Sequence, residues 1–158
     1  MFRKMRRFKQ EVSHEECVSI LQTEKRGVLS VIGDEGYPYA IPMDFYYDAE
    51  EKKIYFHAAR EGHKMDAIKR CDKVCFTTWN TGFRKEGDWS WNVTSVVVMG
   101  RAELVSDTEL ANEKLRKLAL KYYPTVEEVD AEMQRDAHRV QMIAIAMEHM
   151  TGKLVSEK

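Results

Sequence analysis

One segment of the chain, residues 56–66, combines side chains that suit an anion-binding site. A strand pattern ends there, small residues turn the chain, and a helix is predicted to begin near Gly62. A helix N-terminus presents unpaired N–H groups and the positive end of the helix dipole, which suit a phosphate. Lys64 adds a mobile positive charge, and His63 and Arg60 offer further hydrogen-bond donors. These residues indicate a phosphate-binding corner. The alternative is a surface loop with ordinary charges.

A second segment, residues 37–46, is extended and rich in aromatic residues. On a strand its side chains would alternate between two faces. One face would carry Tyr37, Tyr39, Ile41, Met43 and Phe45, and the other would carry Pro38, Ala40, Pro42, Asp44 and Tyr46. The first face is large and apolar, which is typical of core packing. The second is narrow, and its two prolines cannot donate ladder hydrogen bonds, so this strand suits a sheet edge, a bulge or a face open to a planar ligand.

Other site chemistries find no support in the sequence. The candidate nucleophiles Ser30, Ser90 and Ser95 lack the turn signature of an esterase serine. His57 and His63 are the only close histidine pair and have no obvious third metal ligand, and Cys71 and Cys75 also lack further ligands. No metal site is therefore expected. A Walker-type phosphate loop and a dinucleotide glycine fingerprint are both absent.

Length and composition favour one domain over residues 1–158. Hydrophobic residues make up 44% and charged residues 32% of the 158-residue chain, as in an ordinary globular protein. The formal net charge of -1 does not suit a nucleic-acid-binding domain. Three cysteines, an odd number, do not make a disulfide framework, which agrees with a reducing compartment.

The N-terminal arm, residues 1–12, is basic. It carries Arg3, Lys4, Arg6, Arg7 and Lys9. It lacks the apolar core of a secretory signal, and no apolar run elsewhere is long enough to span a bilayer, so we expect a cytoplasmic protein. The arm either contacts an anion or a partner subunit, or is a solvated terminus.

The remaining pattern predicts a β-meander with late helices. A capping box from Ser13 to Glu16 opens a first helix that ends near Gly27. Six strands are predicted, at residues 28–32, 37–47, 54–58, 74–79, 91–105 and 141–148, with a short helix at 62–70. Capping boxes at Ser106 and Thr125 open two more helices, which form a hairpin outside the barrel over residues 106–139. This order favours a mainly β fold, a small antiparallel barrel with peripheral helices, over a parallel βαβ sheet.

Several motifs together resemble a known family. They are Gly36-Tyr37-Pro38 to Pro42, the runs 54–58, 62–66, 74–76 and 95–102, Met150-Thr151-Gly152-Lys153, and the early Met5-Arg6-Arg7. This set resembles the pyridoxamine 5′-phosphate oxidase-like FMN-binding split barrels, and within them the branch of 5-nitroimidazole-resistance proteins. The resemblance implies a six-stranded split β-barrel that forms a homodimer with two FMN sites at the subunit interface.

The resemblance also implies roles for residues of one subunit. Ile41, Pro42 and Met43 would line the isoalloxazine ring, and His57 with Ala58 would follow the ribityl chain. The helix start at Gly62, with His63 and Lys64, would hold the phosphate, which agrees with the phosphate-binding corner that these residues indicate by themselves.

From the other subunit, the resemblance places further residues near the flavin. Trp91, Thr94 and Ser95 would approach the ring, while Thr151 and Lys153 would close the site.

The chemistry implied by that branch is reduction of a small nitro-aromatic such as a 5-nitroimidazole, with NAD(P)H as electron donor. His57 or His63 would donate the proton, since histidine titrates near neutral pH. FAD fits the same phosphate site as FMN. The sequence departs from true pyridoxamine phosphate oxidases because Thr151-Gly152-Lys153-Leu154 replaces their substrate-binding arginine motif, so oxidation of vitamin B6 is not expected.

Two other functions stay open. One is a non-catalytic module that holds flavin or haem for storage or sensing, in which His57, His63 or His149 would supply a haem ligand. The other is a structural dimer with a vestigial site.

Overall fold

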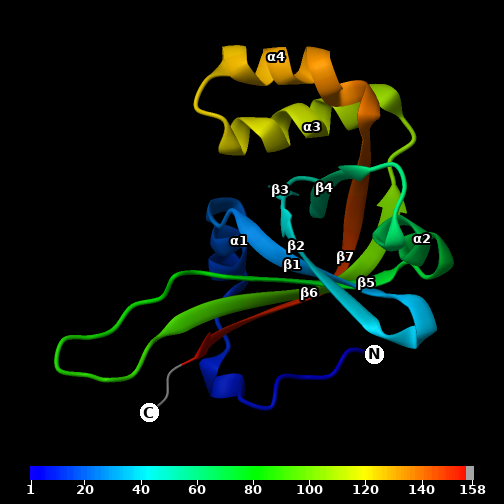
Figure 1. The fold of residues 1–158 in the computed structure, drawn as a ribbon. Coiled ribbons are helices and arrows are strands. Elements are labelled where there is room, and N and C mark those ends of the chain that lie inside the picture. The colour runs from blue at the N-terminus through cyan, green and yellow to red at the C-terminus, as the bar shows by residue number, and fades with distance from the viewer. Residues whose placement is uncertain (156–158) are drawn as a thin grey trace.

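The computed structural model describes residues 1–155, and within them seven strands form one antiparallel sheet (Figure 1). The strands are β1 (Arg26–Ile32), β2 (Pro38–Asp44), β3 (Tyr46–Asp48), β4 (Lys53–Ala59), β5 (Lys73–Trp79), β6 (Val93–Leu104) and β7 (Val140–Val155). Their order across the sheet is β2-β1-β5-β6-β7-β4-β3. The helices are α1 (His14–Thr23), α2 (His63–Arg70), α3 (Thr108–Tyr122) and α4 (Val126–Asp136), with 3-10 turns η1 (Phe8–Gln10), η2 (Asp34–Gly36) and η3 (Ala137–Arg139).

The sheet curls into a split barrel because its two edge strands are nearly continuous in the chain. β2 and β3 lie at opposite edges, yet only Phe45 separates them. The expected class, a mainly β split barrel with peripheral helices, is confirmed. The expected strand count of six was one too low, because the segment predicted as a single strand at residues 37–47 is broken at Phe45.

The break at Phe45 has a clear cause. Its backbone N–H donates to the hydroxyl of Tyr122, and its carbonyl also lies 3.0 Å from that hydroxyl. These groups therefore leave the sheet ladder without losing their hydrogen bonds. The Phe45 side chain is wholly buried in the barrel, where it meets Phe76 edge to face with ring centroids 4.8 Å apart.

The barrel core is formed by the inward faces of the strands. Leu29, Ile54, Phe56, Phe76 and Val98 are completely buried there. Helix α1 adds Cys17, Ile20 and Leu21 to the same core. Gly27 lies in β1, not at the exit of α1 as expected, and a Cβ at this position would come 2.3 Å from the Phe76 ring. Glycine here permits close packing of strand against ring.

The α3–α4 hairpin lies over the end of the sheet that contains β4 and β7 (Figure 1), and a second apolar cluster lies between the hairpin and the outward face of these strands. Tyr55, Leu115, Leu118, Met142 and Ala144 form it. Because strand side chains alternate, β4 contributes Ile54 and Phe56 to the barrel and Tyr55 to this second cluster.

The helix starts agree with the capping predictions at two of three positions. Ser13 forms a full capping box with Glu16, and Thr125 accepts from the N–H of Glu128. The third cap is one residue later than expected, since Asp107 and not Ser106 accepts from the N–H of Leu110. Asp and Ser are about equally good N-caps, and the carboxylate of Asp107 adds a favourable interaction with the helix dipole.

Strand β7 continues to Val155, well past the expected end near residue 148. It pairs with β6 along nearly the whole length of that strand, with a bulge between Met99 and Gly100. None of the helices within residues 1–155 is long and apolar enough to cross a membrane.

A buried lysine connects α3 to the β3–β4 turn. The side chain of Lys114 is 3% exposed, and its ammonium lies 2.8 Å from both Asp48 and Glu51. The hydroxyl of Tyr55 donates to Glu51. Burial opposes ionisation of Asp48, but the Lys114 ammonium and two backbone N–H groups outweigh it and lower the pKa of Asp48.

Replacing Lys114 with alanine should destabilise the protein by about 3–5 kcal/mol, because Asp48 would remain as a buried, unpaired charge. The free energy of unfolding from urea titration at pH 7 measures this. Lys117→Ala, which removes an exposed ion pair with Glu113, should change stability little. Equal losses in the two variants would contradict the role of the buried ion pair.

Candidate functional site

The first turn of α2 is open to a ligand. It begins at His63 after Gly62, whose φ of +130° suits glycine, and no side chain caps its N-terminal N–H groups. A Cβ built at Gly62 would meet nothing within 4 Å. The expected helix start is confirmed, and it presents backbone donors to an open corner.

Lys64 places an ammonium group beside this corner without a compensating carboxylate. Its Nζ lies 3.4 Å from the sulfur of Met43 on β2. Among residues 1–155, no acidic group forms an ion pair with it. Burial lowers the pKa of Lys64, and no neighbouring charge offsets that cost. A half-buried cation of this kind would be stabilised by a bound anion.

His63 lies at the same corner but contacts the turn between β1 and β2. Its Nε2 accepts a hydrogen bond from the Asp34 N–H at 3.1 Å, and its ring stacks on Tyr39 at 4.2 Å. Because Nε2 accepts, the proton of a neutral ring is on Nδ1, which is the atom free to donate to a ligand. Arg60, the further donor expected here, donates instead to the carbonyl of His138.

Strand β2 forms the neighbouring wall. Its register places Ile41 opposite Leu29 and Met43 opposite Gly27, with Pro42 alternating to the other face. Met43 is buried, Ile41 is partly buried against the core, and Pro42 is exposed. Only Pro42 of these three therefore presents its side chain outward. Tyr37 and Tyr39, expected on the core face, are exposed at the strand's start.

His57 and Ala58 are adjacent on β4 but face opposite ways. Ala58 is buried in the barrel core, whereas His57 is exposed and lines a cavity under α3 and α4 together with Asp44. His57 makes no hydrogen bond or ion pair with another residue in the 1–155 range. The two histidines considered as proton donors thus have different surroundings, and none of their described contacts joins them.

The residues assigned to a second subunit lie on β6, on β7 and in the loop before β6. Ser95 pairs with Lys153, and Val97 with Thr151. The Trp91 ring is half exposed and its N–H donates to the Thr81 carbonyl.

Thr94 belongs to the same group, and its backbone N–H donates to Asn80. In Figure 1 the loop between β5 and β6 extends away from α2. Within one chain these residues therefore do not reach the α2 corner.

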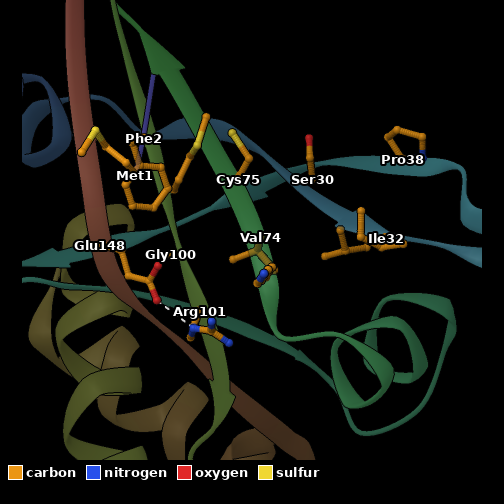
Figure 2. Close-up of a pocket in the computed structure, with 13 residues that line it drawn as sticks. Met1, Phe2, Ser30, Ile32, Pro38, Val74, Cys75, Gly100, Arg101 and Glu148 are labelled. Carbon is orange, nitrogen blue, oxygen red and sulfur yellow. Dashed lines mark hydrogen bonds and ion pairs between the residues drawn. The ribbon is translucent and has the colours of Figure 1, made fainter. Parts of the chain in front are cut away.

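A larger cavity, of about 570 Å³, lies on the outward face of the sheet (Figure 2). Ser30, Cys75 and Met99 contribute to its lining, and Met1 and Phe2 of the N-terminal arm border it. Phe2 also stacks on His149 with ring centroids 4.7 Å apart. This contact could not be predicted, because the arm has no periodic pattern that indicates where it lies.

The described part of the chain has no cluster of side chains suited to a metal ion. Residues 1–155 contain no group of three histidine, cysteine or acidic side chains able to hold an ion, and Cys17, Cys71 and Cys75 are free thiols. Burial raises the pKa of Cys75, and burial together with Glu16 raises that of Cys17, so both thiols are poorly reactive.

Comparison with known proteins decides the family. The model of the pyridoxamine 5′-phosphate oxidase family matches residues 13–154. The chain belongs to this family. No curated protein sequence matches it.

Solved structures of the same fold are similar at low sequence identity. A protein of Bacteroides thetaiotaomicron named for 5-nitroimidazole antibiotic resistance is 21% identical, with a TM-score of 0.76 over 92% of this chain and 87% of the other. A conserved hypothetical protein of Mycobacterium tuberculosis is 18% identical, with a TM-score of 0.79 over 96% and 90%. An FAD- and haem-binding protein of Mycobacterium smegmatis is 18% identical, with a TM-score of 0.74 over 94% and 74%.

The stability of a Lys64→Met variant tests whether the corner is strained by its unpaired charge. Methionine preserves the contact with Met43, so we expect the free energy of unfolding at pH 7 to rise by about 0.5–1 kcal/mol. Because the folded state lowers the pKa of Lys64, the wild type should gain stability as pH rises through that pKa toward 10.5, and the variant should not. A destabilised variant would indicate that Lys64 serves packing instead.

Proposed function

We propose that this protein binds a flavin nucleotide whose terminal phosphate lies at the first turn of α2. The observation that carries the proposal is the uncapped helix start next to the Lys64 ammonium, which no carboxylate pairs with in residues 1–155. Helix dipole, backbone N–H groups and ammonium all favour a phosphate there. The M. smegmatis relative described as binding FAD and haem supports a flavin over other phosphate esters.

The remaining contacts would follow from the strands next to the corner. His57 and Ala58 of β4 would follow the ribityl chain, and Ile41 to Met43 of β2 would border the isoalloxazine ring, chiefly through backbone and Pro42. FMN is the expected cofactor. FAD is the alternative, since a Cβ at Gly62 would meet nothing within 4 Å and the corner is therefore open beside the phosphate.

The proposed assembly is a homodimer. The outward face of the sheet carries exposed apolar side chains, including Ile32, Trp79 and Met99, and the 570 Å³ cavity lies on it. Exposed apolar surface of this kind commonly marks an interface. A second copy would bring its own Trp91, Thr94, Ser95, Thr151 and Lys153 to the flavin.

We further propose an oxidoreductase activity on a small nitro-aromatic, such as a 5-nitroimidazole, with NAD(P)H as electron donor. A bound flavin supplies transfer of electron pairs. The chain's residues would orient the acceptor, exclude water and supply a proton. His57 suits the last role better than His63, because His57 makes no hydrogen bond within residues 1–155, whereas the free Nδ1–H of His63 lies at the proposed phosphate corner. Pyridoxamine phosphate oxidation is not expected, since residues 151–154 continue β7 and replace the arginine motif of true pyridoxamine phosphate oxidases.

A non-catalytic flavin- or haem-binding module is the second candidate. The M. smegmatis relative favours it. Among the three histidines that could bind haem iron, His149 is stacked under Phe2 and His63 is held by Asp34. His57 therefore remains the best haem ligand, and a Soret absorption band in the purified protein would indicate this function.

Flavin titration tests the phosphate site. Quenching of FMN fluorescence should give at least a tenfold weaker affinity for Lys64→Met than for the wild type, which corresponds to about 1.4 kcal/mol. Lys69→Met, an exposed lysine on the same helix, serves as the matched control and should bind FMN normally. Equal losses would show only a general charge effect, and no loss would contradict the assignment.

Turnover tests the proton donor. His57→Ala, assayed at an FMN concentration that saturates the variant, should lose at least tenfold in NAD(P)H-dependent reduction of a 5-nitroimidazole. His63→Ala should lower FMN affinity instead. Full turnover in a His57→Ala variant that binds FMN normally would exclude His57 as the proton donor, and a flavin that NAD(P)H does not bleach would favour the non-catalytic function.

A further inference from the structure

A second cavity, of about 290 Å³, lies between the α3–α4 hairpin and the barrel. Its apolar part comes from Leu115 and Leu118 of α3, Met133 of α4 and Val140 of β7. Its aromatic side chains are those of His57, Tyr122 and Tyr123. The volume accommodates a single substituted ring, and apolar walls with a few polar groups are typical of small-molecule sites.

The charged residues that line this cavity are all acidic. Asp44, Glu132 and Asp136 reach it, whereas no lysine or arginine is part of its lining. Their basic partners lie outside the lining: Arg26 is 3.0 Å from Asp44, Arg135 pairs with Glu132 and is 2.7 Å from Asp136, and Arg139 is 3.7 Å from Asp136. A cavity with carboxylates on its wall and cations outside it favours a neutral or positively charged ligand over an anion.

The cavity also borders β2, which would hold the flavin ring, and β4, which would hold the ribityl chain. Asp44 is the last residue of β2, directly after Met43, and His57 is next to Ala58 on β4. None of the α2 residues that form the phosphate corner lines it. A ring bound here would therefore lie beside the isoalloxazine end of the flavin and away from its phosphate.

We propose that this cavity is the binding site of the electron acceptor. It would take one planar aromatic or heteroaromatic ring, neutral or cationic, and would discriminate against anions and phosphate esters. The acceptor role rests on the flavin function proposed above, whereas the binding preference stands on the cavity alone. His57, whose ring has no described partner, would donate a hydrogen bond to the bound ring.

Three probes of nearly equal shape test the charge preference: benzamidinium, benzamide and benzoate. Their binding to the flavin-free protein can be followed by methyl NMR at Met133 and Leu118. We expect benzamidinium to bind most tightly, benzamide less tightly, and benzoate at least tenfold more weakly than benzamidinium. Absence of any shift at these methyl groups up to millimolar probe would overturn the site, and equal binding of the three would overturn its selectivity.

Two kinds of variant sharpen the test. Glu132→Gln with Asp136→Asn should remove the preference for benzamidinium over benzamide, whereas the control pair Glu109→Gln with Glu127→Gln, which changes net charge equally outside the lining, should retain it. Ala137→Phe should fill the cavity and weaken all three probes. Loss of preference in the control pair would attribute the effect to overall charge and contradict the proposal.

A last measurement separates this proposal from the flavin proposal. In the FMN-loaded protein, saturating benzamidinium should shift the flavin absorption spectrum, because the cavity adjoins the ring. A protein that binds no FMN but retains the probe preference would defeat the flavin function and leave the cavity site intact. Methyl shifts without any change in a bound flavin's spectrum would overturn the acceptor role.

Discussion

The architecture depends on the way Phe45 joins two opposite edges of one sheet. Since a single residue connects β2 to β3, the sheet between them must curl until its edges meet. Helix α3 fixes this connection from outside. Tyr122 bonds both backbone groups of Phe45, and the ammonium of Lys121 donates to the carbonyls of Phe45 and Glu24 while lying 3.8 Å from the centre of the Phe45 ring.

The position of Lys121 carries an electrostatic cost. Burial lowers the pKa of Lys121 to about 8, and the carboxylates of Asp44 and Glu24 only partly offset it. Two carbonyl acceptors and an aromatic face replace the water that the ammonium loses. Lys121 and Tyr122 of α3 therefore hold the α1–β1 junction and the β2–β3 junction together. These are the segments that set the position of the proposed flavin wall.

Local features of the site and fold could be predicted from the sequence. The capping box at Ser13, the cap at Thr125 and the glycine at the start of α2 depend on residues within one helical turn, so their patterns are visible in the chain. The break at Phe45 could not be predicted, because its partner Tyr122 is 77 residues away. The length of β7 likewise depends on its pairing with β6.

In the candidate site, too, local features could be predicted from the sequence and long-range contacts could not. Spacing alone predicted Lys64 and the helix start, whereas the stacking of Tyr39 on His63 and the contact of Lys64 with Met43 arise only when β2 folds beside α2. Strand alternation indicates that His57 and Ala58 face opposite ways, but not that His57 borders a cavity beneath α3 and α4. The second-subunit residues stay a prediction, since a single chain cannot test them.

The one-residue connection at Phe45 also limits how the chain can vary. An inserted residue there would shift β3 by one position against β4 and turn its side chains to the wrong face, so Tyr47 would leave the core that it now helps to form. The loop of residues 80–92 is tied near its ends by the Phe83–Asn92 bridge and the hydrogen bond from Trp91 to Thr81, and the segment between these contacts can vary in length. Differences in length among related chains should therefore accumulate in that loop, while the spacing between β2 and β3 stays invariant.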